Sequence, residues 1–129
     1  MKNKFFILLV SLFVVLLLSG CGKSAEKKEV TINIIDENST ILYNKKIKTK
    51  QEDLLSLLEE LPVEVKYKDL NSSNGTYIVS LLGKDEKKEN SNMYYWVFYV
   101  NDNPILESIS VVKLEDKTTY KFVYEKTSY

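Results

Sequence analysis

The sequence predicts an α+β domain in which a mixed β-sheet packs on a single α-helix. Several short stretches alternate apolar and polar residues with a period of two, which is typical of strands. Only residues 54–61 repeat leucines every three and four positions, which is typical of an amphipathic helix. Clusters of Asn, Asp, Ser and Gly separate these stretches. Because no second helix is predicted, the leucine stripe is expected to cover the sheet.

Residues 1–20 are predicted to be a signal peptide. Two lysines precede an apolar run over residues 5–18, which is shorter than the about 20 apolar residues that span a bilayer. Leu18-Ser19-Gly20-Cys21 follows this run and resembles the lipobox of bacterial lipoproteins. The resemblance implies that the signal is cut before Cys21 and that its thiol carries a diacylglycerol. A secretory signal with an incidental cysteine and a transmembrane anchor are the alternatives.

The lipoprotein interpretation predicts where the chain is found. Membrane lipid bound through Cys21 would hold the domain on the extracellular side of the cell membrane. The chain has no Arg and no His, and it is rich in Lys, Asn and Ile. This bias resembles the proteomes of low-GC Gram-positive bacteria. Residues 21–29 are small and charged, and they are expected to form the lipidated cysteine and a flexible tether.

Composition argues against several function classes. The single Cys and the absence of His leave no disulfide, no metal–thiolate site and no common nucleophile–base pair, so neither an enzyme nor a cofactor is predicted. A Ser–Lys arrangement stays as an alternative without a motif. The acidic residues fall in turns, in the tether or on polar faces, where no raised pKa is expected. Acidic and basic residues balance, so no nucleic-acid partner is expected.

Residues 30–129 are predicted to form one domain, which begins with a hairpin and a helix. Apolar residues alternate over 30–34 and again over 41–47, with turn residues between them. Thr49-Lys50-Gln51-Glu52 fits a capping box, so a helix of about three turns is expected to follow it. Pro62 ends this helix.

The second half of the chain is predicted to consist of strands. Residues 63–67, 76–82 and 120–124 show strand patterns, and Asn71–Gly75 is a turn cluster. The polar stretch 84–92 is expected to be a mobile loop that could close over a ligand. Between residues 105 and 114, burial is predicted for three apolar positions: Ile109, Val111 and Leu114.

Met93–Asn101 holds five aromatic side chains, among them the only Trp. As a strand, this stretch is apolar on both faces, with Trp96 and Phe98 on one face and Tyr95 and Tyr99 on the other. A central strand covered on both sides would have this pattern. A strand with a core behind it and an aromatic ligand surface in front would have it too.

The element order is that of a β-grasp-like fold, in which a mixed sheet wraps one helix. The stretches 75–83 (Gly-Thr-Tyr-Ile-Val-Ser-Leu-Leu-Gly), 95–101 (Tyr-Trp-Val-Phe-Tyr-Val-Asn) and 114–116 (Leu-Glu-Asp) resemble a bacterial domain of unknown function related to the C-terminal domain of transcobalamin. Asp102 and Glu115-Asp116-Lys117 replace glycine-containing turns of that family, and Glu107-Ser108 stands where a Gly is common. The first two departures are expected to change the turn conformations.

The transcobalamin resemblance implies a corrinoid or another small flat ligand, bound by aromatic side chains. The expected ligand-binding residues are Tyr77, Tyr94, Tyr95, Trp96 and Tyr99. The alternative is that Trp96 and Phe98 belong to the core, with the tyrosines packed against neighbours. We therefore expect a membrane-anchored binding module that passes its ligand to a transporter. A surface domain that recognises a protein, peptide or glycan is the alternative.

Overall fold

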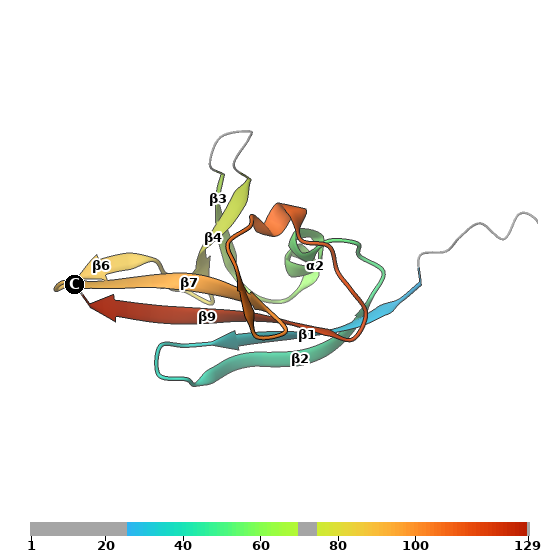
Figure 1. The fold of residues 1–129 in the computed structure, drawn as a ribbon, viewed down its shortest axis with the longest axis horizontal. Helices are drawn as coiled ribbons and strands as arrows, with labels where there is room; N and C mark the ends of the chain where they lie inside the picture. The colour runs from blue at the N-terminus through green and yellow to red at the C-terminus, as the bar shows by residue number, and fades with distance from the viewer. Residues whose placement is uncertain (1–25, 70–74, 129) are drawn as a thin grey trace, which may run out of the picture.

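The computed structural model describes residues 26–69 and 75–128 (Figure 1). The predicted signal peptide, Cys21, residues 22–25 of the tether and residues 71–74 of the predicted turn lie outside the described residues. The elements are, in order, β1 (Lys28–Ile35), β2 (Ile41–Thr49), α2 (Leu54–Glu60), β3 (Val65–Asp69), β4 (Thr76–Leu81), β5 (Lys84–Asp85), β6 (Lys87–Glu89), β7 (Asn92–Val100), β8 (Asn103–Ile105), the 3-10 helix η1 (Ile109–Val111) and β9 (Thr118–Ser128). The predicted α+β class is confirmed.

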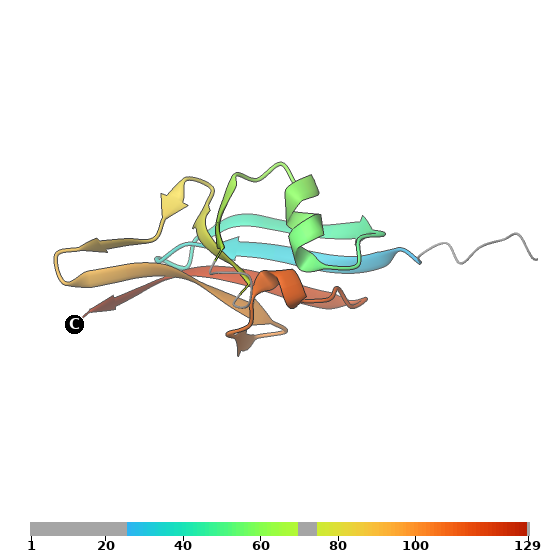
Figure 2. The same ribbon diagram turned by 90° about the horizontal axis from the view of Figure 1, so that it is seen from above.

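A large mixed sheet forms the body of the domain. Its strands lie in the order β2-β1-β9-β7-β6, and β8 pairs with β7. β1 and β9 are parallel, whereas the other neighbouring strands are antiparallel. A small antiparallel sheet, β3-β4-β5, runs across the large one on the side where α2 lies (Figures 1 and 2). The first and last strands of the described chain therefore pair at the centre of the fold.

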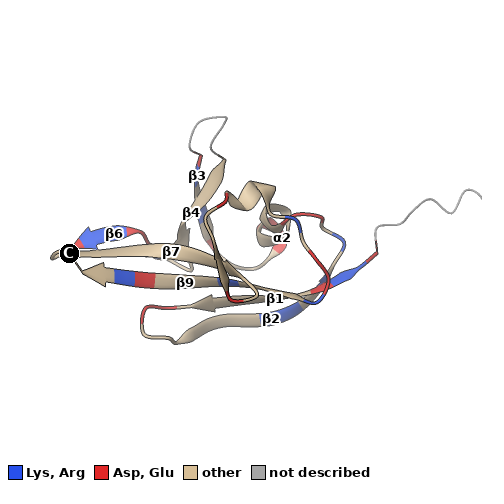
Figure 3. Cartoon of the chain, in the orientation of Figure 1, with Lys and Arg blue, Asp and Glu red and all other residues tan. Residues whose placement is uncertain are grey.

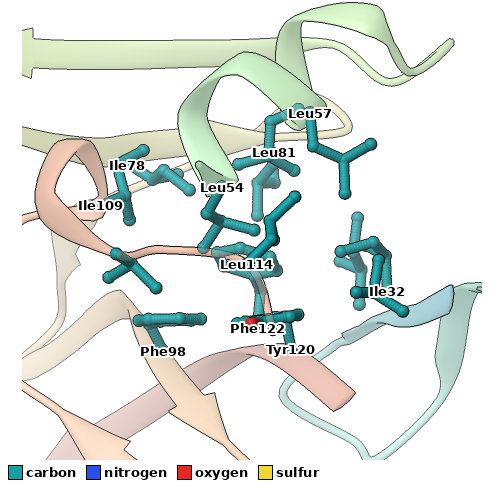
Figure 4. Packing of buried hydrophobic residues seen from close by; sticks show 14 residues of the cluster. Ile32, Leu54, Leu57, Ile78, Leu81, Phe98, Ile109, Leu114, Tyr120 and Phe122 are labelled. Carbon is teal, nitrogen blue, oxygen red and sulfur yellow. The ribbon is translucent and has the colours of Figure 1, made fainter. Parts of the chain in front are cut away.

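The core lies between the large sheet, α2 and β4 (Figure 4). The period-two prediction is confirmed for the two central strands, because alternate residues of each are buried: Val30, Ile32 and Ile34 in β1, and Tyr120, Phe122 and Tyr124 in β9. From the helix, Leu54, Leu57 and Leu58 pack onto them, as the leucine spacing predicted. Burial of these side chains provides the main stabilisation of the domain.

The start of the helix differs from the prediction. Thr49 is the last residue of β2, and its hydroxyl accepts from the Gln51 N–H at 3.0 Å. Asp53 is the N-cap, and its carboxylate accepts from the Ser56 N–H at 2.8 Å. The chain stays extended up to Asp53 because this residue forms a β-bridge with Lys113. The helix is consequently shorter than the expected three turns.

The polar stretch 84–92 is not the predicted loop. It contains β5 and β6, and β6 pairs with the first residues of β7. Asn90 and Ser91 connect them with φ of 47° and 66°, the left-handed pair that a two-residue hairpin turn requires. Charged residues suit β6 because an edge strand must resist pairing with other chains.

Three further expectations concern turns and burial. Asp102 adopts φ of 66°, so the left-handed conformation that glycine favours is present there without glycine. In the second turn the left-handed residue is Lys117, with φ of 60°, and not Asp116, which stands where the resembling family has its glycine. Ile109 and Leu114 are buried as predicted, but Val111 is 58% exposed. Because η1 turns the chain here, the alternation breaks and Val112 is buried in place of Val111.

Candidate functional site

The aromatic strand β7 lies beside β9 and separates its side chains onto two faces, as its sequence pattern predicted. Trp96 and Phe98 face the core, and Phe98 stacks on Phe122 with ring centroids 5.2 Å apart. Tyr95 and Tyr99 lie on the opposite face with Glu125. β7 itself carries no charged residue, whereas β6 and β9 do (Figure 3). Charge near β7 therefore comes from its neighbours.

Trp96 joins the two sheets. Its indole N–H donates to the Lys84 carbonyl at 2.9 Å, and its ring lies 4.9 Å from that of Tyr124. The Tyr124 hydroxyl donates to the next carbonyl of β5, that of Asp85, at 2.5 Å. The buried ring of Tyr124 and the partly buried ring of Trp96 thus hold β5 over the large sheet. Trp96 packs against the core cluster, which agrees in part with the alternative expectation for this residue.

Tyr94 packs against neighbouring side chains. Its ring stacks on Tyr124 with centroids 5.8 Å apart, and the Lys87 ammonium lies 4.9 Å from the Tyr94 ring centroid. These contacts hold a lysine of β6 over β7. Tyr94 therefore does not join the cavity described below.

Tyr99 belongs to a polar cluster on the outer face of the sheet. Its hydroxyl donates to Glu125 at 2.6 Å, and the Tyr95 hydroxyl reaches the other oxygen of the same carboxylate at 3.5 Å. The Lys121 ammonium lies 5.1 Å from the Tyr99 ring centroid. The hydrogen bond to Glu125, together with burial, raises the pKa of Tyr99 to about 12. Tyr99 is thus positioned by β9 and is not brought to the cavity.

A cavity of about 230 Å³ opens at the edge of β7. β6 pairs with β7 as far as Tyr94, and β8 pairs with it from Phe98 onward, so the stretch 95–97 lies between the two partner strands. The β8–η1 segment and β4 form the other walls. The lining residues are Tyr77, Ile78, Glu86, Tyr95, Trp96, Val97, Phe98, Ile105, Leu106, Glu107, Ile109 and Phe122. We call this cavity the β7 edge pocket.

The pocket unites three of the five predicted ligand-binding residues: Tyr77, Tyr95 and Trp96. Tyr77 comes from β4, which crosses the large sheet, so its approach to β7 depends on tertiary packing. Leu106 lies at the rim with 90% of its surface exposed. The pocket is consequently aromatic on the β4 and β7 sides and aliphatic on the β8 side.

Two glutamates that the sequence did not single out, Glu86 and Glu107, also line the pocket. The Glu86 carboxylate accepts a hydrogen bond from the Trp96 backbone N–H, in the gap between β6 and β8. Glu86 is exposed as a residue, yet partial desolvation of its carboxylate raises its pKa and outweighs both this bond and the attraction of Lys68. The expectation that every carboxylate keeps an ordinary environment is therefore wrong for Glu86. Glu86 stands in a run of charged residues, 84–89, in which the sequence does not distinguish it from its neighbours.

Within the described residues, no group of three or more acidic, His or Cys side chains is arranged to hold a metal ion. In the same part of the chain, no helix has the length and apolar character needed to cross a membrane. The chemistry of the described pocket is therefore that of aromatic rings, aliphatic side chains and two carboxylates.

Residues 52–126, more than half of the chain, match the family model described as Domain of unknown function (DUF4430). The chain belongs to this family. The matched stretch runs from just before α2 into β9, so it includes every residue that lines the β7 edge pocket. It leaves out β1 and β2, although β1 supplies part of the core.

The fold is similar to that of a solved protein from Ruminococcus gnavus ATCC 29149, named a "putative metal binding protein". The two share 15% sequence identity, with a TM-score of 0.63, over 78% of this chain and 98% of that chain. At this identity, the similarity shows a common fold alone. No curated protein matches the chain.

Proposed function

We propose that this member of the family is a membrane-anchored extracellular module that binds a small ligand in the β7 edge pocket. The observation that carries the proposal is the convergence of Tyr77, Tyr95 and Trp96 on one cavity from two sheets. Small-molecule sites are typically concave and largely apolar, with a few polar groups that orient the ligand. The pocket has this composition, and a binding role agrees with the scarcity of catalytic residue types.

The size of the pocket limits the ligand. The cavity volume of about 230 Å³ is smaller than the roughly 300–1,000 Å³ of pockets that enclose a drug-sized molecule. A ring-sized group therefore fits inside, and a larger ligand would rest its remainder on the exposed rim near Leu106. A corrinoid, which the transcobalamin resemblance implies, would insert only an edge or a side group.

The β-grasp-like interpretation is supported by the order of elements. A hairpin, β1–β2, precedes α2, and the last strand returns to pair in parallel with the first. The metal-binding description of the Ruminococcus gnavus protein supports a ligand-binding role for the fold in general terms. It supplies no metal ligands here, because the described residues hold no suitable cluster.

Membrane anchoring rests on Cys21 and its lipobox. Fewer than ten residues separate Cys21 from β1, and an extended chain of this length spans at most about 30 Å. A lipidated Cys21 would thus keep the domain near the bilayer. Cys21→Ala should leave the precursor unprocessed or release the protein from the membrane fraction. Normal anchoring of this variant would refute the lipoprotein assignment.

A thermal-shift screen of small molecules, including cobinamide, tests the binding role on the full chain in detergent. A ligand at about 100 times its Kd stabilises the fold by about 2.7 kcal/mol, which is measurable. Ile105→Phe fills the pocket and should abolish each specific shift. Ile41→Phe is the matched control, because Ile41 is exposed on β2 and does not line the pocket. Equal shifts in both variants would contradict the proposal.

One observation favours a surface interaction domain as the second candidate. Leu106 and Val111 are 90% and 58% exposed on the segment that walls the pocket. Exposed apolar side chains grouped beside a cavity are typical of surfaces that contact a protein. If this segment docks a transporter or another surface partner, Leu106→Glu should abolish capture of that partner while Ile105→Phe should not.

A further inference from the structure

The charge on the walls of the β7 edge pocket is one-sided. Apart from Glu86 and Glu107, every lining residue is apolar or aromatic, and none is a lysine. The chain as a whole has 18 basic and 18 acidic residues, whereas the charged residues that line the pocket are all acidic. A lysine outside the lining, Lys68 on β3, attracts the Glu86 carboxylate, and it pairs across from Tyr77. Both glutamates are exposed, so the mouth of the pocket presents negative charge beside aromatic rings.

The Glu86 carboxylate is partly desolvated, although the residue is exposed. The Trp96 backbone N–H lowers its pKa, but the partial desolvation, which raises the pKa, is the larger influence. Attraction by Lys68 is the smallest of the three influences. A carboxylate in this situation gains most from a further positive partner that arrives through the cavity.

The aromatic residues in the pocket walls would also favour a positively charged ligand. Organic cations are attracted to the faces of Trp and Tyr rings. Elsewhere on these strands, the protein already pairs cations with rings, since the Lys87 and Lys121 ammonium groups lie 4.9 Å and 5.1 Å from the ring centroids of Tyr94 and Tyr99. Tyr77, Tyr95 and Trp96 line the same pocket as Glu86, so a cation bound there would have both a carboxylate and aromatic residues around it.

We propose that the β7 edge pocket binds an organic cation, an ammonium group attached to an apolar body of about ring size. This inference rests on the proposed binding function and specifies the chemical class of the group that enters the cavity. Glu86 pairs with the ammonium, the rings of Tyr77 and Trp96 contact its alkyl substituents, and Ile105 and Leu106 contact the apolar body. Anions of the same size are excluded by Glu86 and Glu107.

Three probes of similar size separate charge from shape: benzyltrimethylammonium, the neutral phenylacetamide and the anion phenylacetate. Calorimetry on the full chain in detergent measures their affinities, and the fluorescence of Trp96, the only Trp, reports binding at the pocket. The cation should bind at least about tenfold more tightly than the amide, because only it gains the ionic and ring contacts. The anion should bind most weakly.

Glu86→Gln is the decisive variant. It keeps an acceptor for the Trp96 N–H but removes the charge, so affinity for the cation should fall about tenfold while affinity for the amide is unchanged. Glu89→Gln is the matched control, since Glu89 lies in the same hairpin, is exposed and pairs with Lys87 at 2.9 Å. Glu89→Gln changes the net charge by the same amount as Glu86→Gln, but it should leave the affinities for all three probes unchanged.

The pH dependence gives an independent readout. Because the pKa of Glu86 is raised in the fold, the ligand-free folded protein is more stable with this carboxyl protonated than with it ionised. Glu86→Gln, which is neutral, should therefore not destabilise the ligand-free protein at neutral pH. A bound cation needs the ionised carboxylate. The affinity for the cation should therefore fall as the pH is lowered, beginning above the ordinary glutamate pKa of 4.5. In Glu86→Gln, the decrease in affinity that is due to protonation of Glu86 should be absent.

Two outcomes would overturn the inference in different ways. If the three probes bind equally and Glu86→Gln changes nothing, the pocket binds by shape alone and the binding function stands. If benzyltrimethylammonium does not bind, the cation class is wrong. The binding function itself fails only if Ile105→Phe leaves every ligand found in the screen unaffected.

Discussion

The two faces of β7 carry similar aromatic side chains but differ in what surrounds them. On the inner face, Phe98 is 7% exposed and stacks between rings of β9, and Trp96 donates to the carbonyl of another sheet. On the outer face, Tyr95 and Tyr99 are half-buried and share the Glu125 carboxylate. Aromatic character alone therefore does not say whether a residue stabilises the fold or forms a surface. The role of each residue depends on which other elements pack over its face of the strand.

The edge of the strand combines both environments. Trp96 belongs to the core through its indole, yet its backbone N–H points into the gap between β6 and β8, where Glu86 accepts it. A ligand-binding pocket at this place has a well-held wall on the β7 side, because Phe98 packs in the core and the Trp96 indole is hydrogen-bonded to Lys84.

The largest expected effect is on the inner face. Phe98→Ala should lower the free energy of unfolding by about 3–5 kcal/mol, because it leaves a cavity among packed rings. Its neighbour on the outer face provides the comparison: Tyr99→Ala should cost only about 1–2 kcal/mol, since a half-buried ring loses less buried area. Urea denaturation followed by circular dichroism measures both. Equal losses would show that the outer face is covered in solution.

An intermediate effect is expected at the joint between the sheets. Trp96→Phe removes the donor to the Lys84 carbonyl and should cost about 1 kcal/mol for the hydrogen bond, beyond the lost ring area. Tyr124→Phe removes the donor to Asp85 and should cost a similar amount. Because both bonds hold β5, the double variant should lose less than the sum of the single losses in chemical denaturation. Strict additivity would mean that the two bonds act independently.

The smallest effect on stability, but a clear spectroscopic one, is expected at Glu125. Glu125→Gln removes the charge that holds the Tyr99 proton, so the pKa of Tyr99 should fall from about 12 toward the ordinary 10. Ultraviolet absorbance of tyrosinate during an alkaline titration measures this shift. A raised pKa in the fold stabilises it up to about pH 10, and this contribution is lost as the pH rises through about 12. An unchanged titration in the variant would refute the assigned pair.

Local patterns predicted much of the architecture. Alternation located the strands around Ile32 and Phe122 and the two faces of β7, and the leucine spacing located the helix. The prediction failed where a distant segment decided the conformation. Lys113, far along the chain, keeps Asp53 extended and delays the helix, and pairing with β7 converts a charged stretch into β6. Neither partner is visible in the local sequence.

The candidate site was predictable only in part. The transcobalamin resemblance, together with the aromatic content, pointed to five residues. Tyr77, Tyr95 and Trp96 line the pocket, whereas Tyr94 packs against Tyr124 and Tyr99 bonds to Glu125. Position along the strand did not separate these two groups. The separation depends on where β6 ends and β8 begins, and this is a property of strand pairing.

The sequence by itself determined the fold class, the core-facing sides of β1, β9 and α2, and the aromatic strand, because these follow from periodicity within single elements. Only the tertiary structure decided which aromatic residues meet in a cavity and that Glu86 stands at this cavity, where partial desolvation raises its pKa. Both depend on segments distant in sequence being brought together, and on the displacement of solvent by that packing. A carboxylate in a charged run has an ordinary pKa until another part of the chain covers it.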